Sequence, residues 1–313
     1  MATSLKYPYI KTVTPSESYV GRFAPSPSGH LHFGSLVTAL GSFLQAKSQN
    51  GTWLLRIEDI DPPRVVAGAS DSIMRCLEAH HLFWDHEVVY QSNRGDLYNE
   101  KIQYLTEQGL TFYCQCTRAQ LANLKFHELC VCSDQDLRSE NSAIRFKHHN
   151  IHRQFYDELL GQIDFPIHEI PAQFAIKRKD NLFAYQLAVV VDDIQQGITE
   201  VARGADLVDA TLFQLALYQA FDTPAPRFLH FPVVVTKPGK KLSKQNHACA
   251  VNMNAACTNL IDALEFLGIS LPKDLKGESA QNILNWAICE WDLHKIPAKT
   301  ECIDNRIGQA DSI

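Results

Sequence analysis

The stretch RFAPSPSGHLHFGS (residues 22–35) joins a short apolar segment, 19–24, to a segment with helical periodicity. Leucines recur every fourth residue from Leu36 to Leu44, which predicts a helix over 34–47. The segment TWLLRI at 52–57 is typical of a buried strand. A strand, a turn, a helix and a second strand within roughly 40 residues form a βαβ unit, so the sequence predicts a parallel sheet.

The turn inside this stretch contains residues suited to binding phosphate. Such a turn directs backbone N–H groups and a helix N-terminus toward a phosphate. Gly34 permits close approach of the backbone because it has no Cβ, and His32 carries a hydrogen-bond donor. A proline-rich surface loop is the alternative, and the turn alone does not decide between the two.

A second candidate segment is KPGKKLSKQ, residues 237–245, which holds four lysines in eight residues. Lysine ammonium groups stabilise the negative charge of a phosphoryl-transfer transition state. The alternative is a solvated basic turn, which is what most lysine clusters are.

Composition limits the class of protein. The chain has 313 residues, of which 45% are hydrophobic, enough for about two domains with their own core. A net charge of −6 excludes a wholly basic nucleic-acid binder. No stretch approaches the roughly 20 apolar residues of a membrane span, and the N-terminus lacks the apolar core of a signal peptide. P-loop, dinucleotide, zincin and hydrolase motifs are absent. We expect a soluble cytoplasmic enzyme.

The remaining pattern predicts a core interrupted by an insertion. Further strands are expected at 87–91, 143–147 and 227–235, and the apolar run 182–191 is interpreted as another buried strand. Helices are expected at 65–79, 97–108, 206–218, 255–267 and 280–291. The expected division is a leader (1–18), a catalytic core (19–110 and 180–245), an insertion (111–179) and a helical segment (246–313).

Taken in order, the two candidate segments resemble the HIGH and KMSKS signatures of class I aminoacyl-tRNA synthetases. His32-Phe33-Gly34-Ser35 corresponds to HIGH, and Lys241-Leu242-Ser243-Lys244-Gln245 corresponds to KMSKS. The longer segments RFAPSPSGHLHFGSL and LLRIEDIDPPR are similar to the glutamyl branch of that class, over roughly residues 19–270. The class signature has a second histidine at Ser35, but a small residue there is ordinary in the glutamyl branch.

The resemblance implies a fold and a reaction. The fold is α/β, a Rossmann-like doubly wound parallel sheet with an α/β insertion and a short helical C-terminal segment. Only 68 residues follow Gln245, too few for the anticodon-binding region of a full glutamyl-tRNA synthetase. The short paralogues of this branch are ATP-dependent ligases that activate glutamate without tRNA and transfer it to queuosine in the anticodon loop of tRNA(Asp). We expect a monomer that contacts the tRNA(Asp) anticodon stem-loop and no membrane. A truncated synthetase that charges a tRNA 3′ end and a non-catalytic RNA-binding paralogue are the alternatives.

The same resemblance assigns site residues. His32 and Lys244 are the expected catalytic residues and, with Gly34, bind ATP together with Mg²⁺. The expected glutamate contacts are Arg22, Phe23, Ala24, Pro25, Ser26, Glu58, Tyr185 and Arg203. In this assignment Arg22 pairs with a substrate carboxylate and Glu58 accepts from the substrate ammonium. Each has a structural alternative: Tyr185 as ordinary core, Arg203 as a surface bridge, and Glu58 as part of a turn.

Four cysteines form two C-x-C pairs separated by 13 residues: Cys114, Cys116, Cys130 and Cys132. Four thiolates complete a tetrahedral structural zinc site. The resemblance also implies zinc in the insertion, but with a C-x-C pair, a tyrosine and one further cysteine as ligands. No tyrosine lies between Cys116 and Cys132; Phe126, His127 and Glu128 occupy that region. Three interpretations remain open: Cys130 replaces the missing ligand, His127 replaces it, or the site has decayed to buried thiols.

Overall fold

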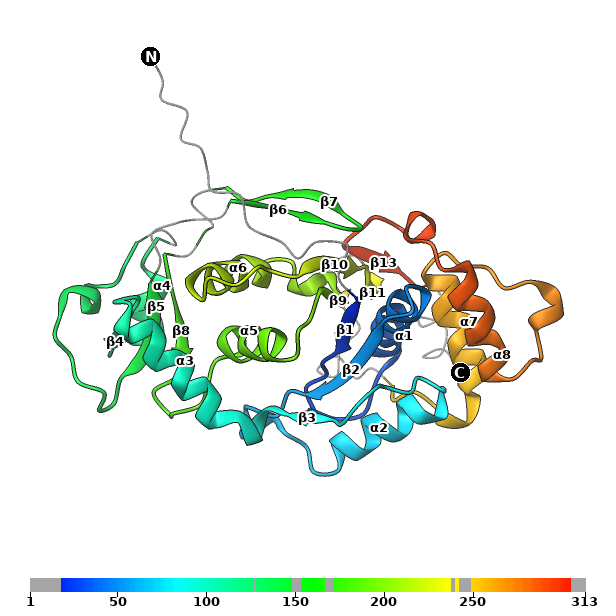
Figure 1. Ribbon diagram of the computed structural model, residues 1–313, viewed down its shortest axis with the longest axis horizontal. Coiled ribbons are helices and arrows are strands. Elements are labelled where there is room, and N and C mark those ends of the chain that lie inside the picture. The colour runs from blue at the N-terminus through cyan, green and yellow to red at the C-terminus, as the bar shows by residue number, and fades with distance from the viewer. Residues whose placement is uncertain are drawn as a thin grey trace, which may run out of the picture.

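The computed structural model describes residues 18–125, 128–147, 153–166, 170, 172–237, 240–241 and 249–304. A twisted sheet runs through the middle of the molecule, with a smaller sheet at one end and two helices, α7 and α8, at the other (Figure 1). The predicted leader, apart from Ser18, lies outside the described residues.

The middle sheet has parallel strands in a doubly wound order. Its strands are β1 (Val20–Phe23), β2 (Thr52–Ile57), β3 (Val89–Tyr90), β9 (Glu200–Gly204) and β10 (Arg227–Phe231). β1 pairs with β2, β2 with β3 and β9 with β10, all in parallel. β1 lies beside β9, where the Thr199 N–H donates to the Val20 carbonyl at 2.9 Å. The strand order is therefore β3-β2-β1-β9-β10, and it reverses direction between β1 and β9, as in a Rossmann-like fold.

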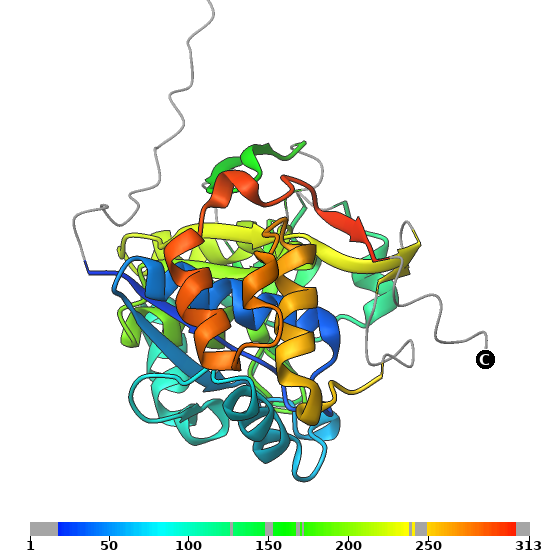
Figure 2. The ribbon, with the colours of Figure 1, turned by 90° about the vertical axis from the view of Figure 1, so that its right-hand side faces the viewer.

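Helices cover both faces of this sheet. One core packs α1 (Phe33–Ser48) and α2 (Ala69–Ala79) with α7 (Ala256–Phe266) and α8 (Ala280–Glu290). The other core packs α3 (Gly95–Glu107), α5 (Tyr185–Gln195) and α6 (Ala210–Ala220). Figure 2 shows α7 and α8 in front of α1. No helix within the described residues is long and apolar enough to cross a membrane.

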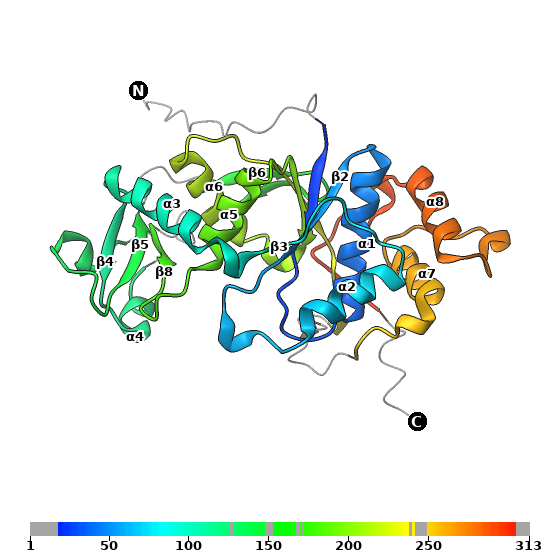
Figure 3. The same ribbon diagram turned by 60° about the horizontal axis from the view of Figure 1, so that its bottom comes forward.

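An antiparallel sheet forms the far end of the molecule (Figure 3). It consists of β4 (Thr111–Cys114), β5 (Ala143–Lys147) and β8 (Gln173–Lys177), with the short helix α4 (Arg118–Ala122) beside it. The hairpin of β6 (Gln154–Asp157) and β7 (Gly161–Asp164) belongs to the predicted insertion by sequence, yet β6 pairs with β10 of the middle sheet. A chain segment from the insertion thus reaches the core.

Two strand predictions are wrong in instructive ways. The apolar run 182–191 contains most of helix α5, in which Leu187 to Val191 are all buried. A short apolar run fits a buried helix as well as a buried strand, so periodicity could not separate them. The expected strand at 227–235 divides at Pro232 into β10 and β11 (Val233–Lys237), since proline has no N–H for a ladder.

The remaining strands that the structure describes form a third sheet, which is also small. β11 pairs in parallel with β13 (Glu301–Ile303) and antiparallel with β12 (Lys240–Lys241). The predictions 52–57 and 143–147 agree with the structure at both ends, whereas the strand expected at 87–91 shortens to 89–90 and the helix expected at 206–218 is α6 at 210–220. α2 begins four residues later than expected, after Gly68 in the left-handed region at φ 74°.

Gly41 on α1 tests the packing of this helix against the sheet. Glycine inside a helix normally costs about 1 kcal/mol relative to alanine. A Cβ at Gly41, however, would lie 2.8 Å from the Phe231 ring of β10. We expect Gly41→Ala to lower the free energy of unfolding by about 1–3 kcal/mol, because overpacking outweighs helix propensity.

Gly95→Ala is the matched control in thermal unfolding. Gly95 has ordinary helical angles, and its nearest contact would be the Phe183 ring at 3.6 Å. This variant should match or exceed the wild type. A Gly41→Ala protein as stable as Gly95→Ala would contradict the close packing of α1 on β10.

Candidate active site

A cavity of about 750 Å³ opens at the carboxyl ends of β1 and β9. In doubly wound sheets ligands bind where the strand order reverses, which here is between these two strands. The glutamate and ATP contacts that the sequence predicts, so far as the structure describes them, all line the cavity: Arg22, Phe23, Ala24, Pro25, Ser26, His32, Gly34, Glu58, Tyr185 and Arg203. Lys244 lies outside the described residues.

His32 stands at the N-terminus of α1. Its Nδ1 accepts from the Ser35 N–H at 3.3 Å, which caps the helix, and its Nε2 lies 3.1 Å from the Ser35 hydroxyl. A Cβ at Gly34 would lie 3.2 Å from the His32 ring, so the glycine makes room for this imidazole. The N-terminus of α1, with His32 and Ser35 beside it, lies on the cavity wall, where helix N–H groups favour an anion.

The lysine-rich segment lies between two described stretches, 240–241 and 249–304. Before it, the hairpin of β11 and β12 ends at Lys241. After it, Ala250 forms an antiparallel bridge with His32, and the Val251 N–H donates to the Leu31 carbonyl at 2.9 Å. The described chain therefore resumes beside His32 after the interval that contains Lys244.

A buried ion network supports the floor of the cavity. Asp193 on α5 accepts from Arg22 Nε at 3.1 Å and from Arg56 Nη2 at 2.6 Å. Burial alone would raise the pKa of Asp193, but the two guanidinium groups outweigh it and hold this pKa below its ordinary value. Both arginines are therefore fixed in place by one ionised carboxylate.

The neighbouring carboxylate extends the network to α3. Asp192 accepts from Gln91 at 2.7 Å, from Arg94 at 2.6 Å and from the Tyr98 hydroxyl at 2.8 Å. The sequence analysis missed Arg56, Asp192 and Asp193. The available signal was an Asp-Asp pair directly after an apolar run, which suggests buried carboxylates only once that run is known to be a helix.

Glu58 is a buried carboxylate with an unused oxygen. Its residue is 8% exposed, and its Oε1 has no hydrogen-bond partner among the described residues. The nearest cation, Arg56 Nη2, is 3.8 Å away. Burial raises the pKa of Glu58 to about 7, and Arg56 and Arg22 limit the rise.

Arg203 is the converse case, a buried cation without a carboxylate at ion-pair distance among the described residues. Its guanidinium donates to four neutral acceptors: His230 Nε2, Gln214 Oε1, the Leu207 carbonyl and Thr211 Oγ1. It also lies over the Phe228 ring, 5.6 Å from the centroid. Burial lowers its pKa.

Among the described residues, the cavity wall thus holds a carboxylate oxygen that accepts no hydrogen bond and a cation without a carboxylate at ion-pair distance. Leaving such groups buried and unpaired is costly, so their presence indicates a ligand that completes them. An amino acid carries the matching ammonium and carboxylate groups. His32 and Gly34, which the sequence predicts to bind phosphate, lie along the same wall.

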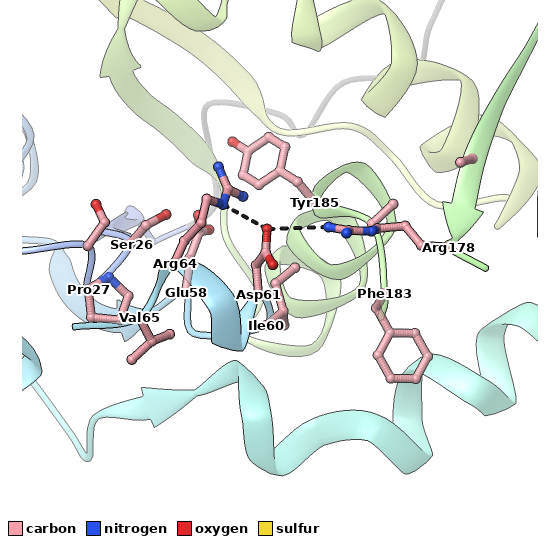
Figure 4. Close-up of a pocket in the computed structure, with 13 residues that line it drawn as sticks. Ser26, Pro27, Glu58, Ile60, Asp61, Arg64, Val65, Arg178, Phe183 and Tyr185 are labelled. Carbon is pink, nitrogen blue, oxygen red and sulfur yellow. Dashed lines mark hydrogen bonds and ion pairs between the residues drawn. The ribbon is translucent and has the colours of Figure 1, made fainter. Parts of the chain in front are cut away.

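A second cavity of about 620 Å³ adjoins the first and shares Ser26, Glu58 and Tyr185 with it. Figure 4 shows Asp61 between two arginines, 2.7 Å from Arg64 Nε and 3.4 Å from Arg178 Nη1. Phe183 forms part of its lining. This cavity lies between the loop after β2 and the end of β8, where the small sheet meets the core.

The four cysteines meet beside β4. Their sulfur atoms all lie within 4.8 Å of one another, with Cys114 and Cys130 at 3.6 Å and Cys116 and Cys132 at 3.5 Å. Tetrahedral zinc with about 2.3 Å bonds separates its sulfurs by about 3.8 Å, so the set fits a zinc ion. Cys130 is part of this group, whereas His127, the alternative ligand, lies outside the described residues.

Comparison with known proteins agrees with this geometry. The family described as tRNA synthetases class I (E and Q), catalytic domain, matches residues 19–264. In fold, the chain is similar to the crystal structure of glutamate-tRNA synthetase from Elizabethkingia anophelis, with a TM-score of 0.76 at 23% identity. The match covers 92% of this chain and 68% of that one. The chain is therefore a class I tRNA synthetase of the glutamyl and glutaminyl group.

Closer relatives define the family within that group. The chain is 48% identical over 286 residues to the Glutamyl-Q tRNA(Asp) synthetase of Vibrio vulnificus, covering 91% of this chain and 94% of the relative. It is also 48% identical over 291 residues to the protein of that name from Photobacterium profundum, covering 93% and 94%. The chain belongs to the glutamyl-Q tRNA(Asp) synthetase family.

Glu58→Gln should separate stability from function. The folded-state pKa of about 7 exceeds the ordinary 4.5, so the folded protein holds this proton more tightly than the unfolded chain. The folded state therefore loses stability as pH rises from about 4.5 to about 7. Glutamine imitates the protonated form, so without ligands the variant should be more stable at pH 8 by about 1–3 kcal/mol.

The same variant should lose glutamate activation, because an amide has no negative charge to pair with the substrate ammonium. The change in stability is measured by thermal unfolding at about pH 5 and pH 8, with Glu78→Gln, on the exposed face of α2, as the control. Equal stability of Glu58→Gln and wild type at both pH values would contradict the buried, unpaired state of Glu58.

Metal analysis tests the cysteine cluster. Purified protein, prepared without chelator, should contain about one equivalent of zinc. Cys130→Ser should lose zinc and unfold at a lower temperature, while Cys289→Ser, at an exposed cysteine outside the cluster, should retain both. Wild-type protein without stoichiometric metal would mean that the four sulfurs are ordinary thiols.

Proposed function

We propose that the chain activates glutamate with ATP, without tRNA, and then transfers the glutamyl group to queuosine in the anticodon loop of tRNA(Asp). The observation that carries this proposal is the cavity in which donor-free Glu58 and counter-ion-free Arg203 lie beside a phosphate-binding helix terminus. The names of the relatives at 48% identity support the same reaction.

In the first step, the α-carboxylate of glutamate attacks the α-phosphorus of ATP, and pyrophosphate leaves. Glu58 accepts hydrogen bonds from the substrate ammonium, and Arg22 and Arg203 bind the side-chain carboxylate. His32, Gly34 and Lys244 contact the phosphates, whose charge Mg²⁺ helps to neutralise. The protein positions the reactants and stabilises charge, and it supplies no nucleophile.

In the second step, a hydroxyl group of the modified nucleoside attacks the carbonyl carbon of the mixed anhydride, and AMP leaves. The second cavity supports entry of this acceptor, because it opens directly onto Glu58 and Tyr185. Phe183 provides an aromatic ring at its wall, and Arg64 and Arg178 provide cations near the RNA backbone. The anticodon stem-loop would approach along the side where β8 meets the core.

Two further parts of the proposal concern zinc and location. Cys114, Cys116, Cys130 and Cys132 would hold a structural zinc ion that fixes the loops around β4. It takes no part in the chemistry. We place the enzyme in the cytoplasm, where ATP, glutamate and tRNA are found together, and expect it to act as a monomer.

Two assays test the proposed function. Glutamate-dependent ATP–pyrophosphate exchange should proceed without added RNA, and glutamine or aspartate should support it poorly. Labelled glutamate should then be incorporated into tRNA(Asp) that contains queuosine, with the label in the anticodon loop, and not into the same tRNA without queuosine. An absolute requirement for tRNA in the exchange assay, or label at the 3′ end, would instead support a truncated glutamyl-tRNA synthetase.

A further inference from the structure

A relay of three side chains lies behind Arg203. The Arg203 Nε–H donates to His230 Nε2 at 3.0 Å, and His230 Nδ1 lies 2.6 Å from Asp157 Oδ2. His230 and Asp157 have no exposed surface, and Arg203 is 4% exposed. Arg203 lies on β9, His230 on β10 and Asp157 on β6. The function proposed above assigns no role to His230 or Asp157.

The hydrogen bonds fix the protonation of the imidazole. Because a guanidinium only donates, His230 Nε2 must accept, and the ring proton must therefore be on Nδ1, donating to Asp157. Burial lowers the pKa of His230 to about 4, with the Asp157 hydrogen bond opposing the change. A doubly protonated ring would set one N–H against the Arg203 N–H.

The hairpin of β6 and β7 holds Asp157 in place. Its Oδ1 accepts from the Leu159 and Leu160 N–H groups at 3.1 and 2.9 Å, which organises the turn before Gly161. The other oxygen, Oδ2, is thereby directed to His230. A turn within the predicted insertion thus controls a side chain of the catalytic core.

Arg203 is left with one donor for a ligand. Its guanidinium has five N–H groups, and four bonds lead to protein acceptors among the described residues. Rotation of the guanidinium plane would redirect the fifth. The four bonds together hold that plane, and the bond to His230 is the one made by Nε.

We propose that Asp157 and His230 are positioning residues that orient Arg203 for the substrate carboxylate. Asp157 also serves as the counter-ion of Arg203, with His230 between the two charges. The guanidinium therefore needs no carboxylate in direct contact. This inference rests on the proposed function, because it takes Arg203 as a glutamate contact.

Asp157→Asn tests the relay with little change in shape. The asparagine Oδ1 can still accept from the turn N–H groups, while its Nδ2 replaces Oδ2 and donates to His230 Nδ1. The ring proton then moves to Nε2 and faces the Arg203 N–H. A wrong tautomer of this kind is known to disable a histidine that depends on a carboxylate partner. We expect the KM for glutamate in pyrophosphate exchange to rise by about tenfold or more, with the KM for ATP nearly unchanged.

Two substitutions of His230 give opposite expectations. In His230→Gln the amide oxygen can accept from Arg203 while the amide N–H donates to Asp157, so the KM for glutamate should stay near the wild-type value. His230→Leu removes the acceptor and should match Asp157→Asn. Rescue by glutamine but not by leucine is not expected of a residue that only fills space.

Glu200→Gln is the matched control. Glu200 is a fully buried carboxylate on the same strand as Arg203, but it contacts Tyr19, Gln45 and Arg227. Its KM for glutamate should not change. An unchanged KM in Asp157→Asn, or equal losses in Asp157→Asn and Glu200→Gln that follow the folded fraction, would overturn the relay. Wild-type protein without glutamate-dependent exchange would instead contradict the proposed function and, with it, the assignment of Arg203 to glutamate.

Discussion

The bifurcated ion pair at Asp193 is the interaction on which the rest of the site depends. One carboxylate on α5 binds Arg22 of β1 and Arg56 of β2, and all three groups are almost completely buried. Removal of one partner from such a group costs about 3–5 kcal/mol, because the remaining charges stay buried. The pairing joins the helix on one face of the sheet to the two strands that carry the phosphate-binding turn and Glu58. Any shift of α5 would therefore move Tyr185 and both arginines together.

Two other buried groups differ from Asp193, whose charge is paired with two arginines. Among the described residues, Glu58 Oε1 accepts no hydrogen bond and Arg203 has no carboxylate at ion-pair distance, although both residues are buried. Both groups line the main cavity, where the strand order reverses. Stability and binding are thus opposed at Glu58, whose ionised form is disfavoured until a cation arrives. At Arg203 the opposition is softened by Asp157, which lies beyond His230 and does not block the ligand.

Local signals explain what the sequence could predict. Strand 52–57 and the helix after His32 follow from apolar periodicity and turn residues, and the glutamyl-branch segments identify most of the cavity wall. Partners distant in the chain could not be found this way. Arg22 and Asp193 are 171 residues apart, and His230 and Asp157 are 73 apart, so only the folded chain brings them together. The apolar run before Asp192 fits a strand as well as a helix, so the sequence does not show that the two aspartates after it are buried on a helix. The cysteine cluster is visible as a spacing, and the structure brings Cys130 to the other three sulfurs, which is one of the arrangements that the spacing predicts.

The central claim is that Glu58 and Arg203 are completed by one amino acid. A crystal structure of the protein with bound glutamate tests it most directly. The account predicts that the substrate ammonium lies about 3 Å from Glu58 Oε1, and that a substrate carboxylate accepts from the remaining N–H of Arg203. A complex in which glutamate binds elsewhere, or binds in the cavity while Glu58 Oε1 stays without a donor, would contradict it.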